Sequence, residues 1–177
     1  RDGTTVAEGC DLFNESQANF SDALALASAA DVVVLTLGIE TCGMNPAHNL
    51  NPGSPGRCYQ ERHTDGYVFP DQYLELEAHD RTTIQLPSVQ QAFAASVLKL
   101  GKPTVIVLMN AGAVAIDNIL PKEHTAPLAL IEAFYPGPRG GEALAQGIFG
   151  LHNRWGRMPY TIYPSSFDTE ASMMEHD

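Results

Sequence analysis

The sequence is poor in basic residues, with 10 Lys and Arg against 21 Asp and Glu among 177 residues and a formal net charge of −11. A chain with this charge repels the phosphate backbone of nucleic acids and the anionic surface of membranes. Long apolar runs are missing too, since stretches such as Val32–Leu35 and Val105–Met109 are far shorter than the roughly 20 residues needed to cross a bilayer. We therefore expect no nucleic acid partner and no membrane span.

Cysteines are few and odd in number, and Cys10, Cys42 and Cys58 leave the redox compartment open. His48 and His63 lie near Cys42 and Cys58 in the sequence. The spacings of these four residues match no standard zinc pattern, so we interpret them as ordinary loop residues. The chain also lacks the glycine spacing of a dinucleotide-binding turn, a phosphate loop and a nucleophile elbow. We expect no metal and no cofactor, and serine hydrolase chemistry has no support.

The residues that are present indicate a packed globular chain, with 44% hydrophobic and 18% charged residues in a length that suits one domain. Helical spacing of apolar residues alternates along the chain with short, continuous apolar runs. The spacing predicts helices over residues 20–30, 87–100, 113–120 and 140–149, strands over 31–38, 104–109 and 128–134, and a candidate edge strand over 160–163. Strands that are apolar on both faces need helices on both sides. The expected fold class is α/β: a three-layer α/β/α sandwich with a mostly parallel central sheet, formed by residues 1–177 as a single domain.

Residues 41–73 interrupt this alternation, because they are rich in Asn, Pro, Gly and charged residues, and we interpret them as a long loop or insertion. Ahead of the first helix, Asn14 and Asn19 each begin an N-glycosylation sequon in a polar stretch. Both asparagines are therefore candidate glycosylation sites, and they favour a secreted protein. Since the chain opens at Arg1 without an initiator Met or a leader, we also expect it to begin in mid-protein.

A group of charged side chains stands between the insertion and the second long helix. It consists of Glu75, Glu77, Asp80 and Arg81. Connections of this kind are where open α/β sheets hold ligands. The two glutamates alternate with leucines, however, and the residues alone favour the exposed face of a short strand over a ligand site.

Two blocks of motifs resemble a known family when their order and spacing are taken together. They are Glu75-x-Glu77-x-x-Asp80-Arg81, Leu86-Pro87 and Gly101-Lys102-Pro103 in the first block, and Tyr135-Pro136-Gly137, Gly140-Gly141-Glu142 and Gly156-Arg157-Met158-Pro159 in the second. The chain is similar to the second, α/β-sandwich domain of glycoside hydrolase family 3, in the branch of β-xylosidases and related β-glucosidases. The resemblance covers nearly the whole chain apart from the insertion.

The resemblance implies a division of labour between two domains. Retaining glycosidases use two carboxyl groups about 5 to 5.5 Å apart, one as the nucleophile and one as the acid/base. In this family the nucleophile is an Asp of a preceding barrel domain, and the sandwich contributes the acid/base. We therefore expect an exo-acting β-glycosidase whose N-terminal barrel is absent from this chain, acting at the non-reducing end of a β-linked oligosaccharide or on an aryl glycoside.

The resemblance ranks the candidates for the acid/base. Glu75, the first glutamate of the motif, comes first, Glu77 second, and Glu40 third because it directly follows the first strand. Asp80 and Arg81 either form an ion pair that orders the loop or contact the sugar. The alternative function is a non-catalytic carbohydrate-binding or structural sandwich that has lost its barrel.

Overall fold

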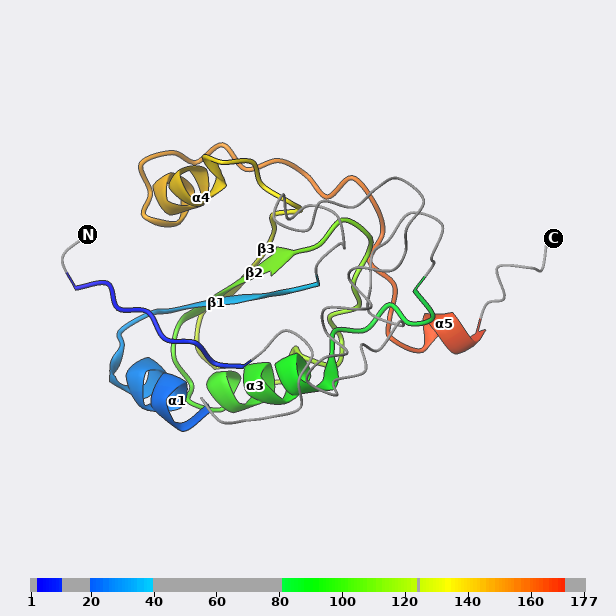
Figure 1. The fold of residues 1–177 in the computed structure, drawn as a ribbon, viewed down its shortest axis with the longest axis horizontal. Helices are drawn as coiled ribbons and strands as arrows, with labels where there is room; N and C mark the ends of the chain where they lie inside the picture. Colours follow the sequence, from blue (N-terminus) through cyan, green and yellow to red (C-terminus); the bar gives the residue numbers. More distant parts are fainter. Residues whose placement is uncertain (1–2, 11–19, 40–80, 124, 171–177) are drawn as a thin grey trace, which may run out of the picture.

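The computed structural model describes residues 3–10, 20–39, 81–123 and 125–170. Its helices and strands, shown in Figure 1, are α1 (Phe20–Ala29), β1 (Val33–Gly38), α3 (Ser88–Leu98), β2 (Thr104–Met109), β3 (Leu128–Glu132), α4 (Gly140–Ile148) and α5 (Phe167–Glu170). The predicted strand over residues 104–109 is confirmed at both ends. The strands predicted over residues 31–38 and 128–134 and the helices predicted over 20–30, 87–100 and 140–149 are present, with ends that differ by a few residues.

The sheet is parallel throughout its described part, with the strand order β1-β2-β3. Val33 pairs with Thr104 on the central strand, and Thr104 pairs with Leu128, so the strands begin in register. They therefore also end next to one another, and everything that follows a strand leaves from the same edge of the sheet. We call this edge the carboxyl edge.

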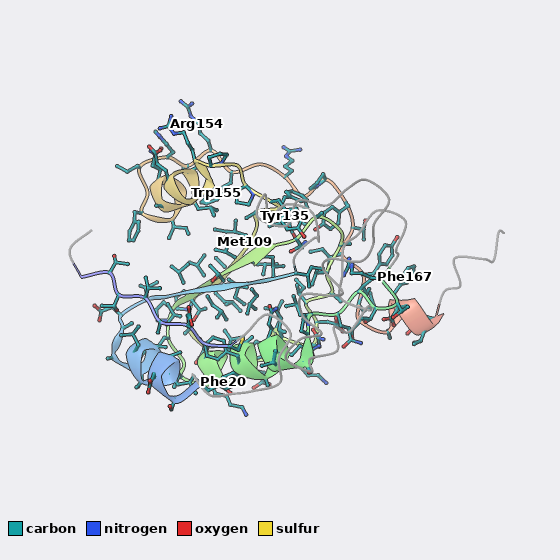
Figure 2. All side chains as sticks on the ribbon, viewed as in Figure 1. Phe20, Met109, Tyr135, Arg154, Trp155 and Phe167 are labelled. Atoms are coloured by element: carbon teal, nitrogen blue, oxygen red, sulfur yellow. The ribbon has the colours of Figure 1, made fainter. Side chains whose placement is uncertain are left out.

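Helices cover the sheet from both sides. Figure 1 shows α1 and α3 on one face and α4 on the other, which confirms the α/β class and its three layers. The core lies between the sheet and α1 and α3, where Ile106 and Leu108 of β2 are completely buried. Phe20 and Phe93 join the two helices with ring centroids 4.8 Å apart, and Figure 2 shows Phe20 at this junction. No residue of α4 is buried, so this helix covers its face of the sheet more loosely.

Local signals set the ends of α3. Pro87 precedes the first turn with φ −50° and ψ 142°, and its carbonyl accepts the first helical hydrogen bond from Gln91 N at 3.1 Å. At the other end Gly101 takes φ +64°, a left-handed conformation that suits glycine and ends the helix. Proline at the start of a helix and glycine just beyond its end are common helix-end signals.

Two predicted elements are wrong. Residues 113–120 form irregular chain and a single turn instead of a helix, because tertiary hydrogen bonds engage the backbone: Ala115 N donates to Ile84 O at 2.7 Å, and Ala113 O accepts from Arg81. Residues 160–163 form no strand, because Tyr160 turns to Glu132 and Tyr163 stacks on Phe167 with ring centroids 4.0 Å apart. Apolar spacing cannot show such partners.

Within the part of the chain that the structure describes, each helix is too short or too polar to traverse a membrane.

The end of β1 is held by one side chain. Gln90 of α3 is 2% exposed, and its amide bonds both backbone groups of Gly38: Nε2 donates to the carbonyl at 2.7 Å and Oε1 accepts from the N–H at 2.9 Å. A side chain on Gly38 would collide with the carbonyl of Met109, so the two strands approach closely here. The backbone N–H and carbonyl at the buried end of β1 thus have their hydrogen-bond partner in a side chain of α3.

We predict that Gln90→Met lowers the free energy of unfolding by about 2 to 6 kcal/mol, because it leaves two buried backbone groups unpaired at about 1 to 3 kcal/mol each. Urea unfolding followed by circular dichroism measures the change. Gln146→Met is the matched control, since the side-chain hydrogen bond that Gln146 makes on α4 is exposed to solvent. Equal stabilities of the two variants would show that the Gln90 bonds contribute nothing.

Candidate functional site

The carboxyl edge brings together residues that are far apart in the sequence. Gly38 pairs with Met109, and Leu108 pairs with Glu132, so the chain leaves all three described strands at one level. Side chains that follow parallel strands gather at this edge, which is where open α/β sheets place their ligand sites. The polar residues found there are therefore the first candidates for function.

Three polar side chains meet at this edge, and we call Asn110, Glu132 and Tyr160 the carboxyl-edge cluster. The Tyr160 hydroxyl donates to Glu132 Oε2 at 2.8 Å, and Asn110 Nδ2 donates to the same oxygen at 3.3 Å. Asn110 is completely buried, and its Nδ2 also donates to the carbonyl of Gly112 at 2.8 Å. The cluster ties the end of β3 to the residues after β2 and to the segment after α4.

The backbone adjusts to this cluster at Phe134. Its N–H donates to Glu132 Oε1 at 3.2 Å, and its φ of 53° lies in the left-handed region. For a residue with a bulky side chain this conformation costs of order 1 to 3 kcal/mol, and it persists only where the surroundings hold it. The ring of Phe134 meets that of Tyr160 edge-on at 6.1 Å, so the cluster and this ring contact hold the turn together.

The cluster keeps capacity to accept hydrogen bonds. An ionised carboxylate has about four lone-pair sites, and Glu132 accepts three bonds from described donors. Asn110 Oδ1 is buried and accepts none within the structure. The cluster is thus acceptor-rich, and the groups that match it are hydroxyl donors.

Hydrogen bonds also hold the residues on either side of segment 40–80, Ile39 and Arg81, near the same edge. The Tyr135 hydroxyl donates to the carbonyl of Ile39 at 2.9 Å. On the other side, Arg81 Nη2 donates to the carbonyl of Ala113 at 2.8 Å, and Nη1 donates to that of Thr83 at 3.5 Å. Ile39 follows β1, and Ala113 lies just beyond the end of β2. Both flanks of the segment are therefore attached close to where the strands end.

The predicted site residues have different outcomes. Glu40, Glu75, Glu77 and Asp80 lie outside the described residues, as do the predicted glycosylation sites Asn14 and Asn19. Arg81 is described, and its guanidinium bonds main-chain carbonyls. The expected ion pair between Asp80 and Arg81 and the alternative contact with a sugar both stay predictions, because Asp80 lies outside the described residues.

The sequence of this chain matches a known protein family. The family model described as the glycosyl hydrolase family 3 C-terminal domain matches residues 3–176. This chain belongs to that family.

Relatives of the family 3 domain are much longer than this chain. It is 29% identical over 171 residues to a β-xylosidase/α-L-arabinofuranosidase of Medicago sativa subsp. varia, covering 96% of this chain and 18% of the relative. It is 34% identical over 161 residues to a probable β-D-xylosidase of Arabidopsis thaliana, covering 90% of this chain and 17% of the relative. The chain thus spans less than a fifth of the curated relatives that it matches.

Solved structures agree with the fold. A family 3 exo-β-xylosidase in complex with a xylobiose aziridine activity-based probe superposes with a TM-score of 0.62 at 28% identity, covering 92% of this chain and 17% of the other. A β-glucosidase from Listeria innocua in complex with gluconolactone gives a TM-score of 0.53 at 24% identity, which supports the fold alone.

Sequence reasoning missed the functional potential of the carboxyl-edge cluster in this family 3 domain. Glu132 ends an apolar strand, and Asn110 directly follows another, which is the available signal for a polar site at a parallel sheet edge. Tyr160 carries no such signal, because its partner Glu132 is 28 residues away in the sequence.

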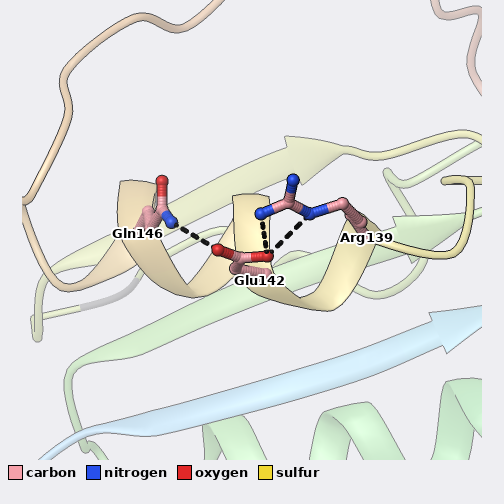
Figure 3. Close-up of polar contacts among 3 residues, drawn as sticks. All are labelled: Arg139, Glu142 and Gln146. Carbon is pink, nitrogen blue, oxygen red and sulfur yellow. Dashed lines mark hydrogen bonds and ion pairs between the residues drawn. The ribbon is translucent and has the colours of Figure 1, made fainter.

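The polar side chains at the start of α4 and along it bond one another. Arg139 Nη2 pairs with Glu142 Oε2 at 2.8 Å, and Gln146 Nε2 donates to Glu142 Oε1 at 3.0 Å (Figure 3). The Arg139 and Glu142 side chains are exposed, and ion pairs of this kind contribute little to stability. Trp155 packs against Gly147, where an added Cβ would meet its ring at 2.6 Å, so this indole supports α4.

Within the described segments, acidic, His and Cys side chains nowhere gather in threes or more to form a group able to hold a metal.

We predict that Tyr160→Phe lowers the free energy of unfolding by about 1.5 to 3 kcal/mol, because it removes a hydrogen bond to a charged acceptor. In a Glu132→Ala background the same substitution has a smaller effect, since the hydrogen bond between Tyr160 and Glu132 is already lost. A double-mutant cycle from urea unfolding measures this coupling. Tyr163→Phe is the control, because Tyr163 is 45% exposed; additive effects of Glu132→Ala and Tyr160→Phe would disprove the coupling.

Proposed function

We propose that this chain supplies the acid/base carboxylate of a retaining, exo-acting β-glycosidase. Membership of the family 3 C-terminal domain supports this proposal, as do relatives that are named β-xylosidases. The chain covers 17% or 18% of those relatives, which leaves ample length for an N-terminal barrel that carries the nucleophile. The domain is one half of a site that two domains complete.

The proposed reaction needs two carboxyl groups, one ionised to act as the nucleophile and one protonated to act as the general acid. The barrel carboxylate attacks the anomeric carbon, and the bond to the leaving oxygen breaks as the acid/base of this chain protonates that oxygen. A covalent glycosyl-enzyme remains. The same residue, now ionised, then removes a proton from water, and the water oxygen displaces the enzyme carboxylate and releases the sugar. No cofactor takes part in these steps.

One observation carries the placement of the acid/base. Ile39 and Arg81, which flank residues 40–80, are both fastened near the carboxyl edge. Glu40 follows Ile39 directly, and Glu75 precedes Arg81 by six residues, which limits its distance from Arg81 to roughly 20 Å. Each is therefore within reach of this edge. We propose Glu75 as the acid/base, with Glu77 and Glu40 as the second and third candidates.

The proposed substrate is a β-linked oligosaccharide or an aryl β-glycoside, cleaved at its non-reducing end. Relatives named β-xylosidases favour xylosides over glucosides as the first substrates to assay. Contact of Asp80 and Arg81 with the sugar stays a proposal. Secretion and glycans on Asn14 and Asn19 also stay proposals, supported by the two sequons.

We predict that Glu75→Ala in the full-length protein lowers kcat for xylobiose by about 100-fold to 10,000-fold, the usual contribution of general acid–base catalysis. The loss is smaller for an aryl β-xyloside, because a good leaving group needs less protonation. Azide restores turnover and yields the β-glycosyl azide, since a small anion can attack the glycosyl-enzyme without a base. Kinetics on both substrates, with product analysis, measure these effects.

Glu77→Ala and Glu40→Ala in the same protein are the matched controls. If one of them shows the azide rescue while Glu75→Ala keeps its activity, the acid/base is that residue. If the full-length wild-type protein binds xylo-oligosaccharides but hydrolyses neither substrate, the domain is a binding sandwich and the enzyme proposal fails.

A further inference from the structure

The carboxyl-edge cluster holds its carboxylate at a cost to the fold. Asn110 is completely buried, and its Oδ1 accepts no hydrogen bond, which destabilises a folded protein. The Nδ2 of the same amide donates to the carbonyl of Gly112 and to Glu132 Oε2. If the amide were turned over, Oδ1 would instead face these two acceptors. The orientation that holds Glu132 is therefore the one that leaves Oδ1 unpaired.

The turn after β3 adds a second cost at the same carboxylate. Phe134 has a φ of 53°, in the left-handed region that a residue with a bulky side chain rarely adopts. Its N–H donates to Glu132 Oε1 at 3.2 Å. Strained backbone of this kind collects where a side chain must be presented in a fixed position. Both the unpaired amide oxygen and the strained turn thus single out Glu132.

Glu132 lies close to the start of the segment that carries the acid/base candidates. The residue is half-buried, so it is not sealed inside the core. Glu132 and Leu37 pair with the same residue of β2, which places them at one level and roughly 10 Å apart, two strand spacings. Tyr135, in the turn after Glu132, already crosses this gap by donating to Ile39 O at 2.9 Å. The cluster and the beginning of residues 40–80 are therefore within a side chain's length of each other.

We propose that Glu132 binds a hydroxyl group of the leaving sugar, the part of the substrate on the far side of the cleaved bond. Glu132 has this role only if the function proposed above holds, since the acid/base then brings this domain beside the leaving oxygen. The carboxylate accepts three hydrogen bonds from described donors, and an ionised carboxylate has about four acceptor sites. One site is left for a hydroxyl of the substrate.

The cluster suits a hydroxyl group better than an ion. The carboxylate repels an anion, and a cation would meet the hydrogens that Asn110, Phe134 and Tyr160 already direct at Glu132. Within the described segments, no three acidic, His or Cys side chains gather to hold a metal. A hydroxyl group donates one hydrogen bond and brings no charge. Sugars are rich in such groups, which agrees with the substrate class proposed above.

Substrate analogues combined with variants of the full-length protein test this role. Methyl β-xylobioside has a leaving sugar with free C2 and C3 hydroxyls, and in each of two analogues one of these hydroxyls is replaced by hydrogen. We expect kcat/KM of the wild type to fall by about 10-fold to 100-fold for one analogue, because a hydrogen bond to a charged acceptor is lost. In Glu132→Ala the same analogue and its parent should differ by less than about 3-fold, since the acceptor is missing.

Each variant is compared with itself on two substrates, so a loss of stability in Glu132→Ala lowers both rates alike and cancels. Glu132→Gln is nearly isosteric and removes only the charge, and it should also show a smaller difference between the two substrates than the wild type. Glu142→Ala is the matched control, because Glu142 is an exposed glutamate of α4, and it should keep the full wild-type difference.

Two results would overturn the role of Glu132 while the proposed enzyme stands, provided that the wild type hydrolyses an aryl β-xyloside. One is a wild type that cleaves both analogues as well as the parent, and the other is a difference between substrates that is the same in Glu132→Ala as in the wild type. A wild type that hydrolyses neither the aryl xyloside nor methyl β-xylobioside would overturn the proposed function and the role of Glu132 together.

Discussion

The parallel pairing of β2 with both of its neighbours is the constraint on which the rest of the structure depends. Its Ile106, Val107 and Leu108 are buried to within 1% exposure, so the strand needs helices on both faces and strands on both sides. Because all pairs are parallel and in register, the chain leaves each described strand at the same edge. Residues that are 70 or more positions apart, such as Gly38 and Asn110, thereby become neighbours of one candidate site.

At this edge side chains replace the backbone partners that the sheet no longer provides. Gln90 bonds both groups of Gly38, Glu132 accepts from Phe134 N, and the Tyr135 hydroxyl donates to Ile39 O. Buried backbone groups must be paired, and each of these bonds also sets the direction in which a loop departs. The same bonds thus hold Gly38, Ile39 and Phe134 in place at the carboxyl edge.

Family membership and chain length together define what this domain can do. It matches the family 3 C-terminal domain over residues 3–176, but it covers less than a fifth of its curated relatives. The proposed function follows from this partial coverage, because the acid/base needs a nucleophile from another domain.

The sequence by itself determined the class of the fold, its strands and its family, because apolar periodicity and the ordered glycine and proline motifs are local signals. Only the tertiary structure decided that residues 113–120 form no helix, because they bond Ile84 and Arg81, which are remote in the sequence. It likewise decided that Tyr160 bonds the remote Glu132 instead of joining a strand. It also decided that Asn110, Glu132 and Tyr160 form one cluster. A hydrogen bond between distant residues leaves no periodic trace in the chain, whereas the burial of a strand or helix face does.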